Sequence, residues 1–467
     1  MPVGWLVLIS HFNGDSLFLT GIADKYNQQI LFLTTLNLIK RVVVQQVLFL
    51  FLVASSSTAF GSSFGNVDEI EITGNNKTQP VAILQELLFK PGDTLTEKLM
   101  QDSEQAVKNM GLFKEVELLP LRRDGKLIVK ISVEEKRFTF VLPKLARSGD
   151  GDITTGIVWR SDNVFGLNQR SKFTLAYKKF KDTEEKDETE VKWEYHYPRI
   201  SNTPYSFKMN IGREQTSLEE TIDGQSGNYE RTRVYVEPFI GRWLKRDGAS
   251  RGVQVRGGLL WQRYEHEFVS GTDGLFPDPT VKAVVASMEG DFVHDMLLSR
   301  SGHHYGYELT YAGSETGSTV ELFKQMLFYR KYIPLPKVDH SNINLQARLG
   351  HTTNSILGPP QFNIAGSRSL RGYERDHVEG NSFLLLNGEW LQPIFNKETV
   401  RGAFIMDVGD AWESDDAVKL SDLKYSVGFG LRWKLKRYVK TDIRLDVAHG
   451  FSEGGTTKVY LGTNSTF

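Results

Sequence analysis

Residues 427–435 read Val-Gly-Phe-Gly-Leu-Arg-Trp-Lys-Leu, and every second residue of this stretch is large and apolar. Between these side chains stand two glycines and the cations Arg432 and Lys434. A strand with this period of two has one apolar face and one charged face. This pattern is typical of a transmembrane β-barrel strand, whose outer face meets lipid while its inner face meets water.

Similar stretches follow one another from residue 138 to residue 467. Another clear example has large apolar residues at Val191, Trp193, Tyr195 and Tyr197, with polar residues between them. A soluble sandwich would also alternate, but it would rarely gather so many aromatic residues on one face and so many charges on the other. Counting segments between turn signals predicts an antiparallel transmembrane β-barrel of about sixteen strands. The expected starts are near Phe138, Asp152, Arg170, Glu188, Tyr205, Glu230, Gly252, Val281, His303, Thr319, Asn342, Ser382, Thr399, Lys424, Thr441 and Thr457.

The composition of the 467 residues agrees with a protein of many strands. Aromatic residues make up 11%, and 42 glycines stand against 15 prolines. A formal net charge of -1 argues against a nucleic-acid-binding protein, since such proteins carry a basic excess. The chain has no cysteine, which excludes disulfides, thiolate chemistry and cysteine metal sites.

The N-terminal region carries the pattern of a secretory signal. Lys40 and Arg41 precede an apolar run at 42–54, and the small residues Ser57 and Ala59 fit a signal-peptidase site. We expect a signal peptide at 38–59, cut after Ala59. The alternative is a permanent helical anchor, but the run is shorter than the roughly 20 residues that span a bilayer. Residues 1–37 are an N-terminal extension with no assigned role.

Residues 60–137 change period several times and predict a small α+β domain. A half-exposed strand around Ile70 comes first, and a helix follows with one apolar face made of Val81, Leu84, Leu87 and Leu88. Thr94 and Glu97 form a capping box for a second helix, which Gly111 ends. Two strands then follow, joined by the hairpin signal Asp124-Gly125.

The order strand, helix, helix, strand, strand resembles a polypeptide-transport-associated (POTRA) domain, as does the passage Gly-Leu-Phe-Lys-Glu-Val at 111–116. In the families that carry them, such domains lie in the periplasm and bind polypeptides by adding a strand to a sheet edge. An unrelated small α+β domain is the alternative. If the domain is periplasmic, loops after odd-numbered barrel strands face the exterior.

The longest expected loop, at 352–380, ends in the stretch Gly-Ser-Arg-Ser-Leu-Arg-Gly-Tyr at 366–373. Here the chain resembles the outer-membrane barrel-assembly superfamily, also called bacterial surface antigen proteins. In that family a long external loop folds back into the barrel, and its arginine meets an aspartate on the thirteenth strand within a motif of aromatic, any residue, Asp, any residue, Gly. The resemblance implies a lock of the loop to the barrel through Arg371, Gly372, Tyr373, Asp407 and Gly409.

The residues support that pairing independently. An arginine in a confined lumen requires a carboxylate, and a guanidinium can bind one through two hydrogen bonds. Asp407 is the expected partner, although Ile405 stands where the family has an aromatic residue. Glu389 and Asp446 are alternative partners if the register differs by one residue. The simplest alternative is that Arg371 points into solvent.

The C-terminus resembles the sorting signal of outer-membrane barrels. Val459, Leu461 and Phe467 fall on one face of the last expected strand, and the sequence ends with Phe467. Such signals are read by assembly machinery through strand addition.

The first and last strands carry features that weaken their pairing. Pro143 has no N–H to donate in the first strand, and Gly462 lies in the last. We hypothesise that the barrel parts at this seam, and that cysteines introduced at Phe140 and Leu461 would lock it. The alternative is that Pro143 only marks the entry from the N-terminal domain.

The resemblance implies an outer-membrane protein that inserts β-barrel proteins or moves polypeptides across the membrane, with the N-terminal domain in the periplasm. Implied partners are unfolded outer-membrane or secreted polypeptides and the lipid bilayer, with periplasmic chaperones and lipoprotein subunits as further candidates. We expect no enzymatic activity, no cofactor, no metal and no nucleic acid. Two other classes stay open, namely a two-partner-secretion transporter with a dedicated client and a passive porin.

Overall fold

The computed structural model describes residues 63–463, with gaps at 149–150, 181–186, 202, 223–224, 247–250, 296–298, 337, 339, 354–361, 375–376, 395–396, 414–419 and 435–441. The expected extension at 1–37, the expected signal peptide at 38–59 and Phe467 lie outside the described residues.

The N-terminal module, residues 63–137, is a small α+β unit. Its elements are β1 (Ser63–Asn66), β2 (Glu69–Thr73), α2 (Pro80–Leu84), β3 (Thr94–Thr96), α3 (Glu97–Asn109), β4 (Phe113–Arg123) and β5 (Lys126–Glu135). β5 pairs in parallel with β2 and antiparallel with β4, while β1 and β3 form a separate two-stranded sheet. Buried side chains such as Val107, Leu118 and Ile131 make one apolar core. The expected order of elements is present, with β1 and β3 in addition.

Both helices differ in detail from the prediction. α2 ends at Leu84, and both Val81 and Leu84 are exposed, so the expected apolar face of four residues is wrong. A helix of five residues is too short for side chains six or seven positions apart to share a face. Among the described residues, no helix is long and apolar enough to cross a membrane.

The cap of α3 is Thr96 rather than Thr94. The Thr96 hydroxyl accepts a hydrogen bond from Leu99 N at 3.2 Å, as an N-cap does. Thr94 lies in β3, where it pairs with Asn66 of β1, and this pairing delays the start of the helix. Gly111 has a left-handed φ of 75° and ends the helix, as predicted.

The hairpin between β4 and β5 turns at Asp124 and Gly125, as the sequence predicts. Both residues have a positive φ, at 51° and 77°. This conformation matches the right-handed twist of the two strands, and it explains why Asp-Gly is favoured here.

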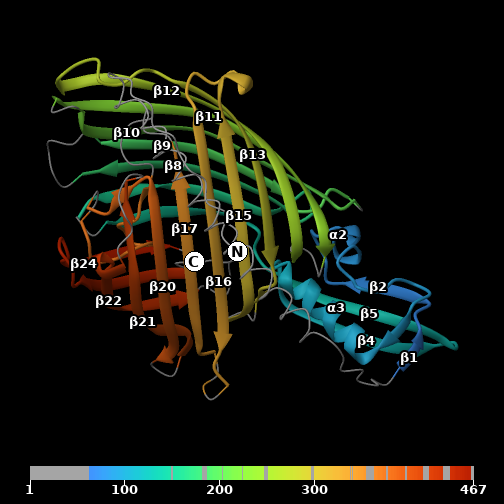
Figure 1. Ribbon diagram of the computed structural model, residues 1–467. Helices are drawn as coiled ribbons and strands as arrows, with labels where there is room; N and C mark the ends of the chain where they lie inside the picture. The colour runs from blue at the N-terminus through green and yellow to red at the C-terminus, as the bar shows by residue number, and fades with distance from the viewer. Residues whose placement is uncertain are drawn as a thin grey trace, which may run out of the picture. The chain divides into compact units, whose positions relative to one another are not determined.

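The rest of the chain forms a closed barrel of sixteen long antiparallel strands, with the two-residue β14 (His294–Asp295) as an additional piece (Figure 1). The strands are β6 (Thr139–Arg147), β7 (Ile153–Val164), β8 (Gln169–Lys179), β9 (Glu188–Tyr197), β10 (Tyr205–Ile222), β11 (Gln225–Arg246), β12 (Gly252–Gly271), β13 (Thr280–Asp291), β15 (Arg300–Ala312), β16 (Leu322–Pro334), β17 (Asn342–Thr352), β20 (Ser382–Ile394), β21 (Lys397–Trp412), β22 (Lys424–Lys434), β23 (Asp442–Gly450) and β24 (Thr457–Thr463).

Most strand starts lie within three residues of the prediction, but β11 begins at Gln225 rather than near Glu230. Gly227 and Asn228, two residue types that are common in turns, stand just before the predicted start. In the structure this pair lies inside β11, where the register toward β12 shifts between Asn228 and Tyr229. In the sequence, a glycine beside a β-bulge therefore looks the same as a glycine in a turn.

The two faces of each strand differ as the alternation predicts. On β22, Phe429 and Trp433 are 68% and 51% exposed, whereas Ser426 and Arg432 are buried. The exposed aromatic side chains form the outer surface, and the buried polar side chains point into the lumen. Inward-facing polar residues of β20 to β23 thus lie on one wall of the lumen, where the candidate site is built.

The barrel closes between β24 and β6, and the described part of this seam contains little pairing. Among the described residues, these two strands share one residue pair, Leu461 with Arg147. The neighbouring pairings are longer, since β6 pairs with β7 along its whole length and β23 pairs with β24 from Ile443 to His449. Within the described ranges, the ladder at this seam is the shortest between long strands of the barrel.

Candidate functional site

The long loop between β17 and β20 folds back onto the inner wall of the barrel. Its described part contains two short strands, β18 (Phe362–Asn363) and β19 (Glu379–Gly380), which pair with each other. Apolar side chains of the loop and of β20 form one buried cluster. Its members are Phe362, Ile364, Leu370, Tyr373, Val378, Phe383 and Leu385. The loop is therefore held by an apolar core of its own and not only by charges.

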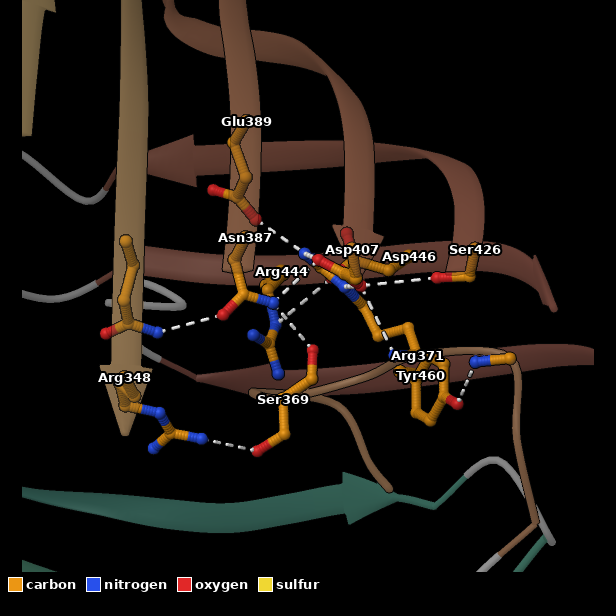
Figure 2. A network of polar contacts seen from close by, with 12 residues as sticks. Arg348, Ser369, Arg371, Asn387, Glu389, Asp407, Ser426, Arg444, Asp446 and Tyr460 are labelled. Atoms are coloured by element: carbon orange, nitrogen blue, oxygen red, sulfur yellow. Dashed lines mark hydrogen bonds and ion pairs between the residues drawn. The ribbon is translucent and has the colours of Figure 1, made fainter. Parts of the chain in front are cut away.

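Arg371 lies at the tip of this loop and is fully buried. Its Nε and Nη2 donate to the two carboxylate oxygens of Asp407, each at 2.7 Å, and its main-chain N donates to Oδ2 at 3.2 Å (Figure 2). Asp407 is fully buried as well. The structure therefore brings together the two residues that the sequence pairs, and Arg371 does not point into solvent.

The two alternative partners also contact Arg371. Its Nη1 donates to Glu389 Oε1 at 3.0 Å and to Asp446 Oδ2 at 3.4 Å. The three carboxylates come from β20, β21 and β23, and their side chains converge because all three strands turn these residues inward. The alternatives weighed from the sequence are thus three simultaneous partners of one guanidinium.

Two further arginines, which the sequence reasoning missed, balance the charge. Arg432 Nη2 donates to Glu389 Oε1 at 2.8 Å, and its Nη1 donates to Asp446 Oδ1. Arg444 Nε lies 3.5 Å from Asp446 Oδ2. Three guanidinium groups and three carboxylates therefore form one buried network, which we call the luminal ion network. Charges that are removed from water need such pairing to be tolerated.

Neutral polar groups complete the coordination of Asp407. Asn387 and Ser426 lie directly beside Asp407 on the neighbouring strands. Asn387 Nδ2 donates to Asp407 Oδ1 at 2.8 Å, and it also donates to the main-chain oxygen of Ser369 at 2.8 Å. Ser426 Oγ donates to Asp407 Oδ2 at 3.4 Å. Only the strand register reveals these partners, because nothing in their sequence positions distinguishes them.

Gly372 and Tyr373 attach the loop tip to the last strands. Gly372 N donates to the hydroxyl of Tyr460 on β24 at 2.9 Å, and the Tyr373 hydroxyl donates to the main-chain oxygen of Tyr425 at 2.7 Å. Gly372 has a φ of 83°, and a Cβ there would lie 2.4 Å from the main-chain N of Gly450. No side chain fits at this position.

The motif on β21 differs from the family pattern in one side chain only. Ile405 faces inward, is fully buried and packs with Leu391 and Ala403, while Phe404 lies on the outer face. Ile405 therefore fills the apolar position that an aromatic residue occupies in the family. A Cβ on Gly409 would lie 2.5 Å from the main-chain oxygen of Leu384, so Gly409 permits close approach of β20.

The seam residues are only partly where the sequence places them. Pro143 lies inside β6, opposite Ile157 of β7, and Gly462 lies in β24. Val459 and Leu461 both lie on the outer face, at 38% and 41% exposure. Leu461 pairs with Arg147, whereas Phe140 lies seven residues further along β6. The proposed cross-link between Phe140 and Leu461 is therefore wrong, because the antiparallel register does not bring these residues together.

The chemistry of this site is electrostatic and structural. Within the described residues, no group of three or more His, Cys, Asp or Glu side chains could hold a metal ion. The carboxylates of the luminal ion network form ion pairs with arginines. The arrangement can hold the loop tip inside the barrel through contacts with each of the last five strands, β20 to β24.

The fold and this network make comparison with known proteins informative. Residues 163–448 match the Omp85 superfamily domain. The chain belongs to the Omp85 superfamily. Residues 66–136 match the POTRA family, described as a surface antigen variable number repeat, so this Omp85 protein carries one POTRA module at these positions. Membership of the superfamily fits a function in outer-membrane assembly or translocation.

Solved structures share the fold of this Omp85 protein at low sequence identity. The crystal structure of BamA from Haemophilus ducreyi lacking POTRA domains 1–3 has a TM-score of 0.52 at 14% identity, over 85% of this chain and 84% of that one. CdiB from Acinetobacter baumannii has a TM-score of 0.59 at 14% identity, over 85% and 73%. CdiB from Escherichia coli has a TM-score of 0.61 at 13% identity, over 85% and 76%. No curated protein gives a significant match to the chain.

Proposed function

We propose that this Omp85 protein assists the insertion of β-barrel proteins into a bacterial outer membrane, or the passage of polypeptides across it, by opening between β24 and β6. The observation that supports the proposal is the single residue pair, Leu461 with Arg147, that joins the described parts of these two strands. An opened seam exposes main-chain donors and acceptors of two strands, to which a client strand can add by pairing. Strand addition needs no nucleotide and no active site, so the protein acts without enzymatic catalysis.

The luminal ion network supports this proposal by fixing the rest of the wall. Its three carboxylates lie on β20, β21 and β23, so the strands before the seam are cross-braced through Arg371. Opening can then concentrate at the β24–β6 contact. We place the POTRA module in the periplasm, where it would present a sheet edge to unfolded polypeptides, with periplasmic chaperones or lipoprotein subunits as further partners.

A disulfide across the seam tests the proposal. Because the chain has no cysteine, the pair Arg147→Cys and Leu461→Cys introduces the only thiols. The oxidised variant in liposomes is expected to lose its acceleration of the folding of a urea-unfolded barrel client, and reduction is expected to restore it. The matched control is Trp159→Cys with Phe173→Cys, which pair across β7 and β8. Oxidation of this pair is expected to leave the acceleration intact.

The same assay separates the proposal from its alternatives. Full acceleration with the seam oxidised contradicts opening at this seam. A protein that gives steady ion conductance, but neither binds unfolded polypeptide nor accelerates client folding, would be a passive porin. Export of one dedicated client without any effect on barrel insertion would identify a two-partner-secretion transporter.

A further inference from the structure

The POTRA module contains a carboxylate whose surroundings do not satisfy it. Glu86 follows α2 and is fully buried. Within the described residues, neither of its carboxylate oxygens has a hydrogen-bond partner. Buried carboxylates are normally paired and hydrogen-bonded, because burial otherwise disfavours the charged form strongly. Glu86 is therefore not explained by the stability of the module alone.

Two cations of the barrel face this carboxylate. Arg199 follows β9 and Arg246 ends β11. Both donate to the main-chain oxygen of Gln85, Arg246 through Nη2 at 2.7 Å and Arg199 through Nη1. Arg199 Nη1 also lies 4.0 Å from Glu86 Oε1, which is an ion pair without a hydrogen bond. The two arginines therefore bind the main chain beside Glu86, while the Glu86 carboxylate accepts no hydrogen bond from them.

Neutral groups make further contacts between module and barrel in this region. Gln79 N donates to the main-chain oxygen of Gly166 at 2.9 Å, and Asn163 Nδ2 donates to Thr78 Oγ1 at 2.9 Å. α3 also packs against β14, whose His294 lies with its Nε2 2.9 Å from Arg251 Nη2. The Gln79, Gly166, Asn163 and Thr78 groups keep their charge between pH 4 and pH 9. Glu86 is the carboxylate that lies beside Arg199 and Arg246, and the Glu86→Gln variant separates its contribution from that of His294.

Burial raises the pKa of Glu86 to about 7, and the charge of Arg246 opposes the shift. Separation of the module from the barrel turns would return water to the carboxylate, and its pKa would fall toward the usual 4.5. In the docked arrangement, Arg199 Nε and Arg246 Nη1 are buried without a hydrogen-bond acceptor. Separation would expose both atoms to water as well.

We propose that Glu86, Arg199 and Arg246 form a proton-dependent latch that docks the POTRA module on the barrel turns after β9 and β11. This inference does not rest on the proposed function, and it concerns how the two parts of the chain are coupled. The docked state has the raised pKa, so protonation favours docking. Docking is strongest below pH 4.5, weakens as the pH rises to about 7 and is constant above that. A shift from 4.5 to about 7 corresponds to a change of roughly 300-fold in the docking equilibrium.

Electron paramagnetic resonance distances on the full chain test the latch. Spin labels are attached to cysteines at Lys98→Cys on α3 and Val338→Cys in the turn after β16, both exposed positions. A mild urea titration at pH 5, 6, 7 and 8 brings the docked fraction into the measurable range. In the unsubstituted latch, the urea midpoint of undocking is expected to fall between pH 5 and pH 7 and then level off.

Glu86→Gln is expected to abolish this pH dependence and to hold the docked distance at pH 8 as it is at pH 5. Glu97→Gln, an exposed carboxylate on α3, is the matched control and should keep the response of the unsubstituted protein. Arg246→Gln provides a second variant, since it removes both a cation and a bond to Gln85. It should lower docking at every pH and move the pH midpoint upward.

Three results would overturn the latch. They are an undocking midpoint independent of pH, a Glu86→Gln variant that keeps the full pH response, and an Arg246→Gln variant whose pH midpoint does not move upward. The barrel fold of each variant is checked by its resistance to unfolding in detergent without heating. Because the readout is a distance, it is independent of client insertion and remains valid if the proposed function fails.

Discussion

The guanidinium of Arg371 and the carboxylate of Asp407 meet edge to edge, with two N–O distances of 2.7 Å and no solvent exposure on either side chain. This geometry is the strongest form of a charged hydrogen bond that an arginine makes. Because both side chains are buried, loss of either one leaves the charge of the other buried without a partner.

Reversal of the charge at Arg371 should release the loop. Arg371→Glu places a fourth carboxylate among Glu389, Asp407 and Asp446, and we expect a loss of about 3–5 kcal/mol in stability of the docked loop. Rapid trypsin cleavage in the loop and lower client-folding activity would report it. Addition of Asp407→Arg should restore part of both.

Two outcomes would contradict this role of the pair. The control Arg368→Glu changes an exposed arginine of the same loop and should leave protease resistance nearly unchanged. Equal sensitivity of the two single variants would show that loop charge alone matters. No rescue in the double variant would shift the main role to Glu389 or Asp446.

Gly372→Ala should disrupt the loop tip without changing any charge. The left-handed φ of 83° disfavours a side chain, and the new Cβ would meet Gly450 N at 2.4 Å. We expect a destabilisation of about 1–3 kcal/mol from the backbone conformation alone. Thermal unfolding followed by circular dichroism measures the change. Gly388→Ala on β20, where the nearest atom lies 3.7 Å from the added Cβ, is the control and should unfold like the parent.

Tyr460→Phe should weaken the attachment of the loop tip to β24. The substitution removes one hydroxyl and leaves the buried N–H of Gly372 without its acceptor at 2.9 Å. The expected cost is about 1–3 kcal/mol. Hydrogen exchange at residues 370–373 should accelerate, with little change in the apolar cluster around Phe383. Unchanged exchange at Gly372 would mean that the Tyr460 hydroxyl does not hold the tip.

Thr96→Ala should destabilise α3, because it removes the hydroxyl that accepts from Leu99 N. Loss of such a cap costs about 1 kcal/mol. Hydrogen exchange in the first turn of α3 should accelerate. Thr94→Ala removes a contact to Asn66 in the β1–β3 sheet and should leave that turn unchanged. The reverse order of effects would restore Thr94 as the cap.

Much of the barrel could be predicted because alternation and turns are local signals. The predicted strand starts at Lys424 and Thr457 coincide with the first residues of β22 and β24. The start of β11 was misplaced, since a glycine at a bulge and a glycine in a turn look alike in a sequence. The pairing of Arg371 with Asp407 could be predicted from the motif and from the need for a carboxylate.

The rest of the site could not be predicted because it depends on register and closure. Arg432 and Arg444 enter the luminal ion network, and Tyr460 reaches Gly372, only because the strand register brings these inward-facing side chains to the same level of the barrel. Tyr460 lies between Val459 and Leu461. The apolar pattern of these two residues indicates the outer face of β24, whereas Tyr460 lies on the inner face. The partner of Leu461 was also misjudged, since sequence position alone does not give the stagger between the first and last strands.

The attachment of Gly372 to Tyr460 has a consequence for the order in which the barrel forms. Arg371, Gly372 and Tyr373 precede their hydrogen-bond partners in the chain, which lie on β20, β21, β22, β23 and β24. Arg371 therefore cannot reach its buried state until the C-terminal strands have arrived. Burial of the loop tip therefore requires a complete barrel. In a barrel that lacks β24, we expect Arg371 to be exposed and open to cleavage.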